Sequence, residues 1–255
     1  INNDTITHSG TGWNIDNVSI TNNDTITHSG TSWVLNTCTL TNNGSIAYSG
    51  NVWDFNVASH LINNPGATIT YSGTSITINQ NFTQTGTFSL TGKTITFDGG
   101  SSAIITATGD MGGTVVINKT ALANDSVTVA SGTIHLGASP ATAIAETGSL
   151  TNNGTIVIDS GTWTVSGANS GGALINNGTI THSGSGWDFN AAELTNNGGA
   201  TITYAGTSMT VMDSFTQSGT FNLTGKTVTF DSGFDFTLKG VFSGNVTINK
   251  GANNY

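Results

Sequence analysis

Arginine is missing from this chain of 255 residues, and charged residues of every kind are scarce. Only 7% of the residues are charged, all five cations are lysines, and the net charge is −9. This balance argues against nucleic acid and anionic membrane surfaces as partners. Apolar runs stay well below the roughly 20 residues that a membrane-spanning helix needs, so we expect no membrane insertion.

Cysteine and proline are nearly absent as well. The single cysteine, Cys38, excludes an internal disulfide framework. Because the sequence starts without Met and shows no signal segment, we expect a mature product or a fragment of a longer repeat chain. Scarce lysine and cysteine beside abundant Asn, Thr and Gly suit a secreted bacterial or archaeal protein. We therefore expect an extracellular or cell-surface location.

The chain is rich in repetition. An apolar anchor recurs just before a pair of polar residues, and neighbouring anchors lie 20, 21, 21, 24, 20 and 21 residues apart. Each unit continues with a Thr-Ile-Thr-like segment, a Ser-Gly turn and a Trp-x-apolar segment. The anchors are Ile20, Leu40, Leu61, Phe82, Leu150, Leu174, Leu194 and Phe215.

Within each unit the apolar residues alternate with polar ones, a period of two that is typical of β-strands. Asn, Ser and Gly, which favour turns, separate these short segments. We therefore predict an all-β, right-handed parallel β-helix (a β-solenoid) with about 20–21 residues and three short strands per coil. About twelve coils would form a rod roughly 55–60 Å long at ~4.8 Å per coil.

A longer period lies above the coil repeat. Residues 61–98 and 194–231 are identical at 27 of 38 positions without gaps, and the wider match pairs 61–119 with 194–250. We therefore predict a single rod over 1–255, made of about two copies of a superrepeat of roughly 131–134 residues. The segment 99–149 is the least regular, and we expect irregular coils there.

Pairs of asparagine occupy the turn after most anchors. Identical Asn side chains at a solenoid turn can stack and hydrogen-bond along the rod, as in amyloid-type Asn ladders. The alternative is glycosylation, because the chain holds eleven N-x-[ST] triplets. We favour a structural ladder of Asn22, Asn23, Asn42, Asn43, Asn63, Asn64, Asn152, Asn153, Asn176, Asn177, Asn196 and Asn197.

Ring residues recur in two registers. His8, His28 and His182 share a slot with tyrosines and an isoleucine, which favours a packed stack over a metal site. A second register holds tryptophans, replaced in some units by Ile or Met. An exposed Trp row could bind sugar rings, but this replacement favours a place in the core. Cys38 is expected to be a buried, inert residue.

Thr-x-Thr pairs flank an inward Ile in several units, so both threonines are expected to point outward. Stacked on neighbouring coils, they would form two rows of hydroxyl and methyl groups. This short motif resembles the Thr-x-Thr arrays of ice-binding β-solenoids. The simpler interpretation is a solvated strand face. The candidate surface-binding residues are Thr5, Thr7, Thr25, Thr27, Thr68, Thr70, Thr179, Thr181, Thr201 and Thr203.

Catalytic motifs are missing from the sequence. The fourteen acidic residues are scattered or recur with the repeat, and none forms an isolated pair of the kind that glycoside hydrolysis needs. Neither a nucleophile elbow nor a phosphate-binding loop is present. We therefore predict that the chain is not an enzyme and has no catalytic, metal-binding or cofactor-binding residues.

The anchors, Asn pairs and Ser-Gly turns resemble those of secreted bacterial β-solenoid exoproteins, namely filamentous-haemagglutinin-like adhesins and autotransporter passenger domains. The resemblance implies a structural repeat region of an extracellular or cell-surface fibre or adhesin. The expected partners are further copies, through head-to-tail or lateral assembly, or neighbouring repeats of the same chain. Ice binding and a carbohydrate-binding stalk, with glycans as partners, remain as alternatives.

Overall fold

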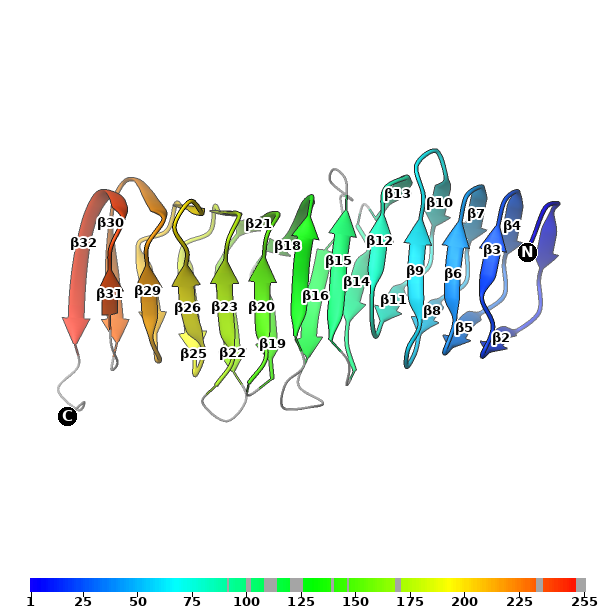
Figure 1. The fold of residues 1–255 in the computed structure, drawn as a ribbon, viewed down its shortest axis with the longest axis horizontal. Coiled ribbons are helices and arrows are strands. Elements are labelled where there is room, and N and C mark those ends of the chain that lie inside the picture. The colour runs from blue at the N-terminus through cyan, green and yellow to red at the C-terminus, as the bar shows by residue number, and fades with distance from the viewer. Residues whose placement is uncertain are drawn as a thin grey trace.

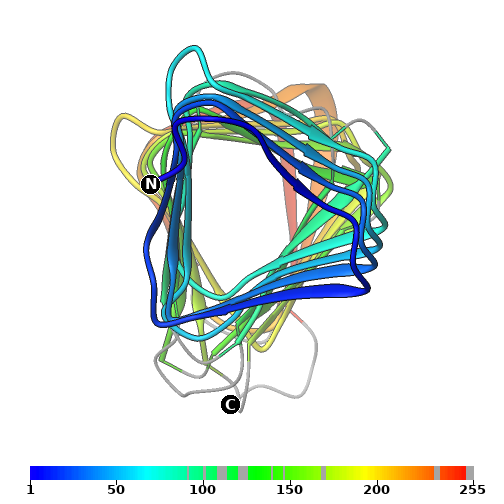
Figure 2. The same cartoon turned by 90° about the vertical axis from the view of Figure 1, so that its right-hand side faces the viewer.

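The computed structural model describes residues 1–90, 92–99, 102–107, 114–119, 126–138, 140–145, 147–167, 171–232 and 236–250. Every regular element among them is a β-strand, and all of the strand pairs are parallel. The chain winds as an elongated rod (Figure 1), and viewed from the N-terminal end it turns clockwise as it recedes (Figure 2). The predicted right-handed parallel β-helix is therefore confirmed.

Three strands per coil build three faces of the rod. The first face has two separate segments. Its N-terminal segment contains β1 (Ile6–His8), β4 (Thr25–His28), β7 (Ser45–Tyr48), β10 (Thr68–Tyr71) and β13 (Thr87–Ser89). Its C-terminal segment contains β18 (Thr133–Ala138), β21 (Thr155–Ser160), β24 (Thr179–His182), β27 (Thr201–Tyr204) and the beginning of β30 (Thr220–Ser232).

The second face runs the length of the rod. Its strands are β2 (Gly12–Asp16), β5 (Ser32–Asn36), β8 (Val52–Phe55), β11 (Ser75–Ile78), β14 (Thr94–Phe97), β16 (Thr114–Lys119), β19 (Ala141–Ile144), β22 (Thr162–Gly167), β25 (Gly186–Asn190), β28 (Ser208–Val211) and the end of β30. Strand β30 therefore turns the corner between two faces, and β32 (Val241–Lys250) pairs with it on both sides of that corner.

The third face is a continuous sheet of eleven strands, one fewer than the roughly twelve coils expected. These strands lie side by side in the foreground of Figure 1. They are β3 (Ile20–Asn22), β6 (Thr39–Asn42), β9 (His60–Asn63), β12 (Phe82–Gln84), β15 (Ala103–Ala107), β17 (Val127–Ser131), β20 (Ser149–Asn152), β23 (Ala173–Asn176), β26 (Glu193–Asn196), β29 (Phe215–Gln217) and β31 (Phe236–Leu238).

Alternation of inward and outward side chains explains why these sequences form strands. In β4, Ile26 and His28 are buried, whereas Thr25 and Thr27 face outward and are partly exposed. No single coil can cover its own apolar side, so the core forms only when coils stack. The largest fully buried side chains include Trp33, Trp53, Trp163 and Trp187, which fill the interior of the rod.

Register is kept over most of the rod and shifts near its middle. The pairing of β15 with β17 shifts between Ile105 and Thr106, and β18 pairs irregularly with β21. Both irregularities lie within or beside 99–149. Part of that expected irregular segment lies outside the described residues, as do residues 251–255.

Left-handed backbone recurs at the corner between the second and third faces. Asn17, Thr37, Ala58 and Ala191 all have φ between 53° and 57°. Asparagine tolerates this conformation, but a β-branched residue is strained there by roughly 1–2 kcal/mol. Thr37 is exposed, so its side chain contributes little packing to offset the strain.

Replacing Thr37 with Asn should therefore raise the free energy of unfolding by about 1 kcal/mol. Asn17 shows that this residue fits the same corner one coil earlier. Chemical denaturation measures the change, with Thr41→Asn on the extended strand β6 as the control that should not stabilise. Equal effects of the two substitutions would contradict the role assigned to the left-handed corner.

Candidate functional site

A buried amide ladder runs inside the corner between the third and first faces. The Nδ2 of Asn22 donates to Oδ1 of Asn42 at 2.8 Å, and Asn42 donates in turn to Asn63 at 2.8 Å. Each ladder residue also bonds the backbone, as Asn42 does to the carbonyl of Thr68 at 3.1 Å. The ladder residues from 22 to 63 are 0% exposed, so these bonds satisfy polar groups that water cannot reach.

The same ladder continues in the second half of the rod. Asn152 donates to Asn176 at 2.8 Å, and Asn176 donates to Asn196 at 2.7 Å. The sequence analysis missed three members of the ladder. Asn2 donates to Asn22 at 2.7 Å, and Gln84 and Gln217 accept from the preceding ladder asparagines at 3.0 and 2.9 Å. The position of the two glutamines directly after the anchor Phe-Thr was the signal that could have revealed them.

The second asparagine of each pair forms a separate, outer ladder. Asn43 Nδ2 donates to Asn23 Oδ1 at 2.8 Å and Asn64 donates to Asn43 at 2.6 Å. Asn177 likewise donates to Asn153 at 2.9 Å and accepts from Asn197 at 2.6 Å. The donors of this ladder point toward the N-terminal end, opposite to those of the inner ladder. The predicted Asn ladder is therefore confirmed, as two antiparallel rows with different exposure.

A third row of amides and carboxylates lies along the second face, and the sequence analysis did not anticipate it. Asn56 Nδ2 donates to Asn36 Oδ1 at 2.9 Å, and Asn36 donates to Asp16 at 2.5 Å. Farther along, Asn118 donates to Asp98 at 3.2 Å. These side chains are outward, so the row crosslinks coils at the surface without satisfying buried groups.

The slot shared by His and Tyr bridges the Ser-Gly turn. His28 Nε2 donates to the carbonyl of Ser32 at 2.9 Å, and Tyr71 Oη donates to that of Ser75 at 2.6 Å. Both rings thus donate a hydrogen bond to the backbone carbonyl of the residue four positions later. Gly50 lies in the turn that follows Tyr48. A Cβ on Gly50 would lie 2.0 Å from the Gly30 carbonyl oxygen, so the Tyr48 ring and the preceding coil leave room only for glycine.

Burial changes the pKa values of these rings. Desolvation lowers the pKa of His182 to about 4 and lowers that of His28 as well. Desolvation also raises the pKa of Tyr48 to about 12. The rings of His28, His182 and Tyr48 are therefore neutral at physiological pH. Among the described residues, no group of three or more His, Cys, Asp or Glu side chains is placed to hold a metal ion.

The tryptophan register faces the core. Trp13, Trp33 and Trp53 stack with ring centroids 4.8 and 5.1 Å apart, and the latter two are 0% exposed. Trp163 and Trp187 stack in the same way at 5.0 Å and are also fully buried. Rings at this depth cannot contact a sugar, so a carbohydrate platform would have to use other side chains. Cys38 is buried, as predicted.

The predicted Thr-x-Thr residues lie on the outside of the first face. Some of their rows are mixed, because Thr27 pairs with Ala47 and Thr181 pairs with Val157. Thr179 and Thr201 instead belong to an unbroken row of Thr133, Thr155, Thr179, Thr201 and Thr220. The two segments of this face are not paired with each other, since β13 and β18 belong to different sheets. The candidate rows are therefore outward but do not run the whole length of the rod.

Two further threonine rows lie on the third face and were missed by the sequence analysis. The signal was the residue directly after each anchor, which is Thr in most units. The register shift between β15 and β17 divides these residues into two rows, because Thr106 pairs with Ser131 and Thr128 pairs with Ile104. The first row contains Thr21, Thr41, Ile62, Thr83 and Thr106. The second row contains Thr128, Thr151, Ile175, Thr195, Thr216 and Thr237.

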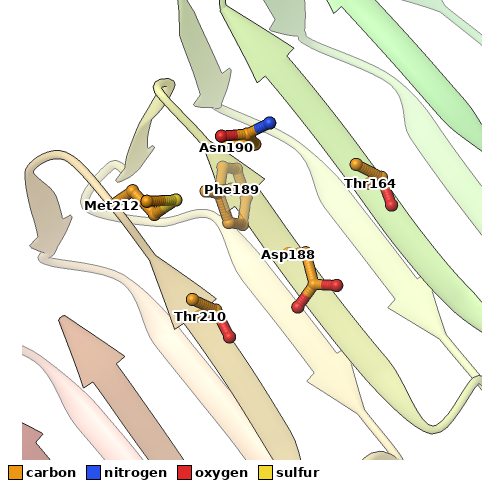
Figure 3. Close-up of a pocket in the computed structure, with 6 residues that line it drawn as sticks. All are labelled: Thr164, Asp188, Phe189, Asn190, Thr210 and Met212. Atoms are coloured by element: carbon orange, nitrogen blue, oxygen red, sulfur yellow. The ribbon is translucent and has the colours of Figure 1, made fainter. Parts of the chain in front are cut away.

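An open hollow of about 390 Å³ lies on the second face (Figure 3). Asp188 is its single carboxylate, flanked on the neighbouring strands by Thr164 and Thr210. Asn190 and Met212 complete its outward rim. This lining lacks the second carboxylate that the two-carboxylate mechanism of glycoside hydrolysis requires.

Comparisons with protein-family models, curated proteins and solved structures find no match for this chain. Among the described residues, no helix is long and apolar enough to cross a bilayer.

Proposed function

We propose that this chain is a structural repeat region of an extracellular or cell-surface fibre. The single observation that supports this most directly is the inner amide ladder. The same buried hydrogen bond joins coil to coil from Asn2 to Gln84 and again from Asn152 to Gln217. An interface that is the same at each step can extend a rod without limit, which suits mechanical reach.

Two forms of such a fibre are open to a direct test. In one, neighbouring repeats belong to a much longer chain; in the other, separate copies assemble head to tail or laterally. Immunogold labelling of the native source, imaged by electron microscopy, should mark surface filaments at regular intervals. Denaturing electrophoresis then separates the two forms, because a longer chain migrates far above 26.0 kDa.

Label confined to dispersed material, with no filament in any preparation, would overturn the fibre proposal. A denatured band at the mass of this chain, together with labelled filaments, would instead favour assembly of separate copies.

Ice binding is a second candidate, favoured by the two threonine rows of the third face. Within each row the side chains repeat every ~4.8 Å along the rod and present methyl and hydroxyl groups at regular spacing. Glu193 is the one acidic residue that faces outward from the described strands of this face. A regular surface with little charge suits an ordered, uncharged lattice such as ice better than it suits an ionic partner.

Thermal hysteresis of the purified chain tests this candidate. Thr83→Lys with Thr195→Lys on the third face should abolish the activity, because long charged side chains disrupt the regular surface. Thr27→Lys with Thr181→Lys on the first face is the matched control and should retain it. The candidate fails if the parent chain shows no hysteresis, or if both pairs of substitutions act alike.

A further inference from the structure

The four Asn-Gly dipeptides of the outer ladder are chemically unequal in the fold. They are Asn43-Gly44, Asn153-Gly154, Asn177-Gly178 and Asn197-Gly198. Asparagine followed by glycine is the sequence most prone to deamidation, because the small glycine leaves its backbone nitrogen free to attack the Asn side chain. Whether that nitrogen is free therefore decides which site reacts.

Three of these glycines are restrained by the inner ladder. The backbone N–H of Gly154 donates to Asn152 Oδ1 at 3.1 Å, and those of Gly44 and Gly178 donate to the preceding inner asparagines at 3.3 Å. The glycines also lie close to the coil before them. A Cβ on Gly44 would come within 2.1 Å of the Asp24 carbonyl oxygen, so the backbone there has no room to move.

Gly198 lies in a different environment. It is exposed, and a Cβ built on it would meet nothing within 4 Å. Among the described residues, its N–H donates no backbone hydrogen bond. The turn is closed instead by the N–H of Ala200, which donates to the Asn197 carbonyl at 3.0 Å, while Gly199 has φ of 88°. This geometry is that of a type II turn.

The first superrepeat contains a natural counterpart of this turn. Ala67 N–H donates to the Asn64 carbonyl at 3.0 Å, and Gly66 has φ of 82°. The residue that corresponds to Gly198 is Pro65, which has no N–H and cannot act as the nucleophile. The same turn therefore lacks the attacking nitrogen in the first superrepeat and has it in the second.

We propose that Asn197 is a site of spontaneous deamidation on the surface of the rod. The Gly198 backbone nitrogen loses its proton and attacks Asn197 Cγ. The new C–N bond forms as the Cγ–Nδ2 bond breaks, and the side-chain nitrogen leaves as ammonia with the proton it gains. Water then hydrolyses the resulting succinimide at either carbonyl, which yields aspartate or isoaspartate.

Deamidation changes the outer ladder at this corner. Asn197 Nδ2 donates to Asn177 Oδ1 at 2.6 Å, and an aspartate would replace that donor with an acceptor carrying negative charge. The inner ladder residue Asn196 remains buried and bonded to Gln217 at 2.9 Å. The product is therefore a more acidic rod with the same core.

Peptide mapping by mass spectrometry of the purified chain, aged at physiological temperature and mildly alkaline pH, tests the proposal. Conversion at residue 197 should be severalfold faster than at 43, 153 and 177. In denaturant the four rates should converge, because the restraints on Gly44, Gly154 and Gly178 are then lost. The Gly198→Pro variant should abolish conversion at 197 alone.

Similar native rates at all four sites, or conversion at 197 that persists in Gly198→Pro, would overturn the proposal. Folding of the variant is checked by its unfolding midpoint. The midpoint should rise slightly, because proline fits the same turn at Pro65 and restricts the unfolded chain.

Discussion

Asn176→Leu should lower the free energy of unfolding by about 3–5 kcal/mol. Asn176 accepts from Asn152 at 2.8 Å and from the Gly178 N–H at 3.3 Å, and it donates to Asn196 at 2.7 Å. Leucine has a similar volume, so the packing loss is small. It leaves several buried polar groups without partners, and each such group costs about 1–3 kcal/mol.

The neighbouring residue is the matched control. Asn177 makes the corresponding ladder bonds at the surface, where water replaces a lost partner, so Asn177→Leu should change stability by less than about 1 kcal/mol. Equilibrium denaturation of both variants measures the difference. Equal losses would mean that the inner ladder contributes no more than the outer one, contrary to its burial.

Acid should weaken the fold through His182, which is 1% exposed. The Gly184 N–H donates to its Nδ1 at 3.0 Å, which requires a ring with no proton on that nitrogen. The surrounding rings are Trp163, Trp187 and Tyr204, with centroids 6.3, 5.4 and 4.9 Å away. Protonation would bury a charge among these rings and oppose the Gly184 donor.

The sign of the effect follows from the lowered pKa. The unfolded chain binds a proton at His182 near the ordinary value of 6.5, whereas the folded chain resists it until about 4. The contribution of the neutral ring is therefore complete above pH 6.5 and is lost as the pH falls toward 4. Over that range the loss is about 3 kcal/mol, at 1.36 kcal/mol per pKa unit.

His182→Tyr isolates this effect, because tyrosine occupies the same slot in the next coil at Tyr204. The variant retains the carboxylates of the parent, so only the histidine contribution disappears from its pH profile. Unfolding free energies measured between pH 7 and 4 should fall less steeply for the variant. Parallel profiles would show that His182 does not bind a proton differently in the folded and unfolded chains.

Periodicity made most of the fold readable from the sequence. The register of His28 with Tyr48 and of Trp33 with Trp53 follows from counting residues between anchors, and the strand pairing has both. This works because each coil must fill the same positions as the coil below it. Successive side chains of a strand point to opposite faces, and this alternation decides which of them are buried.

Other features depended on how coils stack. The two asparagines of a pair look alike in the sequence, yet Asn22 is buried and Asn23 is exposed. The first side chain points into the rod and the second points outward. Gln84 joins the buried ladder although its side chain is longer than that of Asn. Neither result could be predicted from residue type alone.

The sequence by itself determined the coil length, the parallel β-helix, the buried tryptophan stack and the presence of an amide ladder. Each of these depends on local alternation repeated at a constant interval. Only the tertiary structure decided that the third face carries two separate threonine rows, that the first face is divided, and that Gly198 is unrestrained while Gly178 is not. The first two features depend on which strands pair, and such pairs join residues about twenty positions apart or more. The third depends on the turn geometry that brings the Gly178 N–H to the side chain of Asn176.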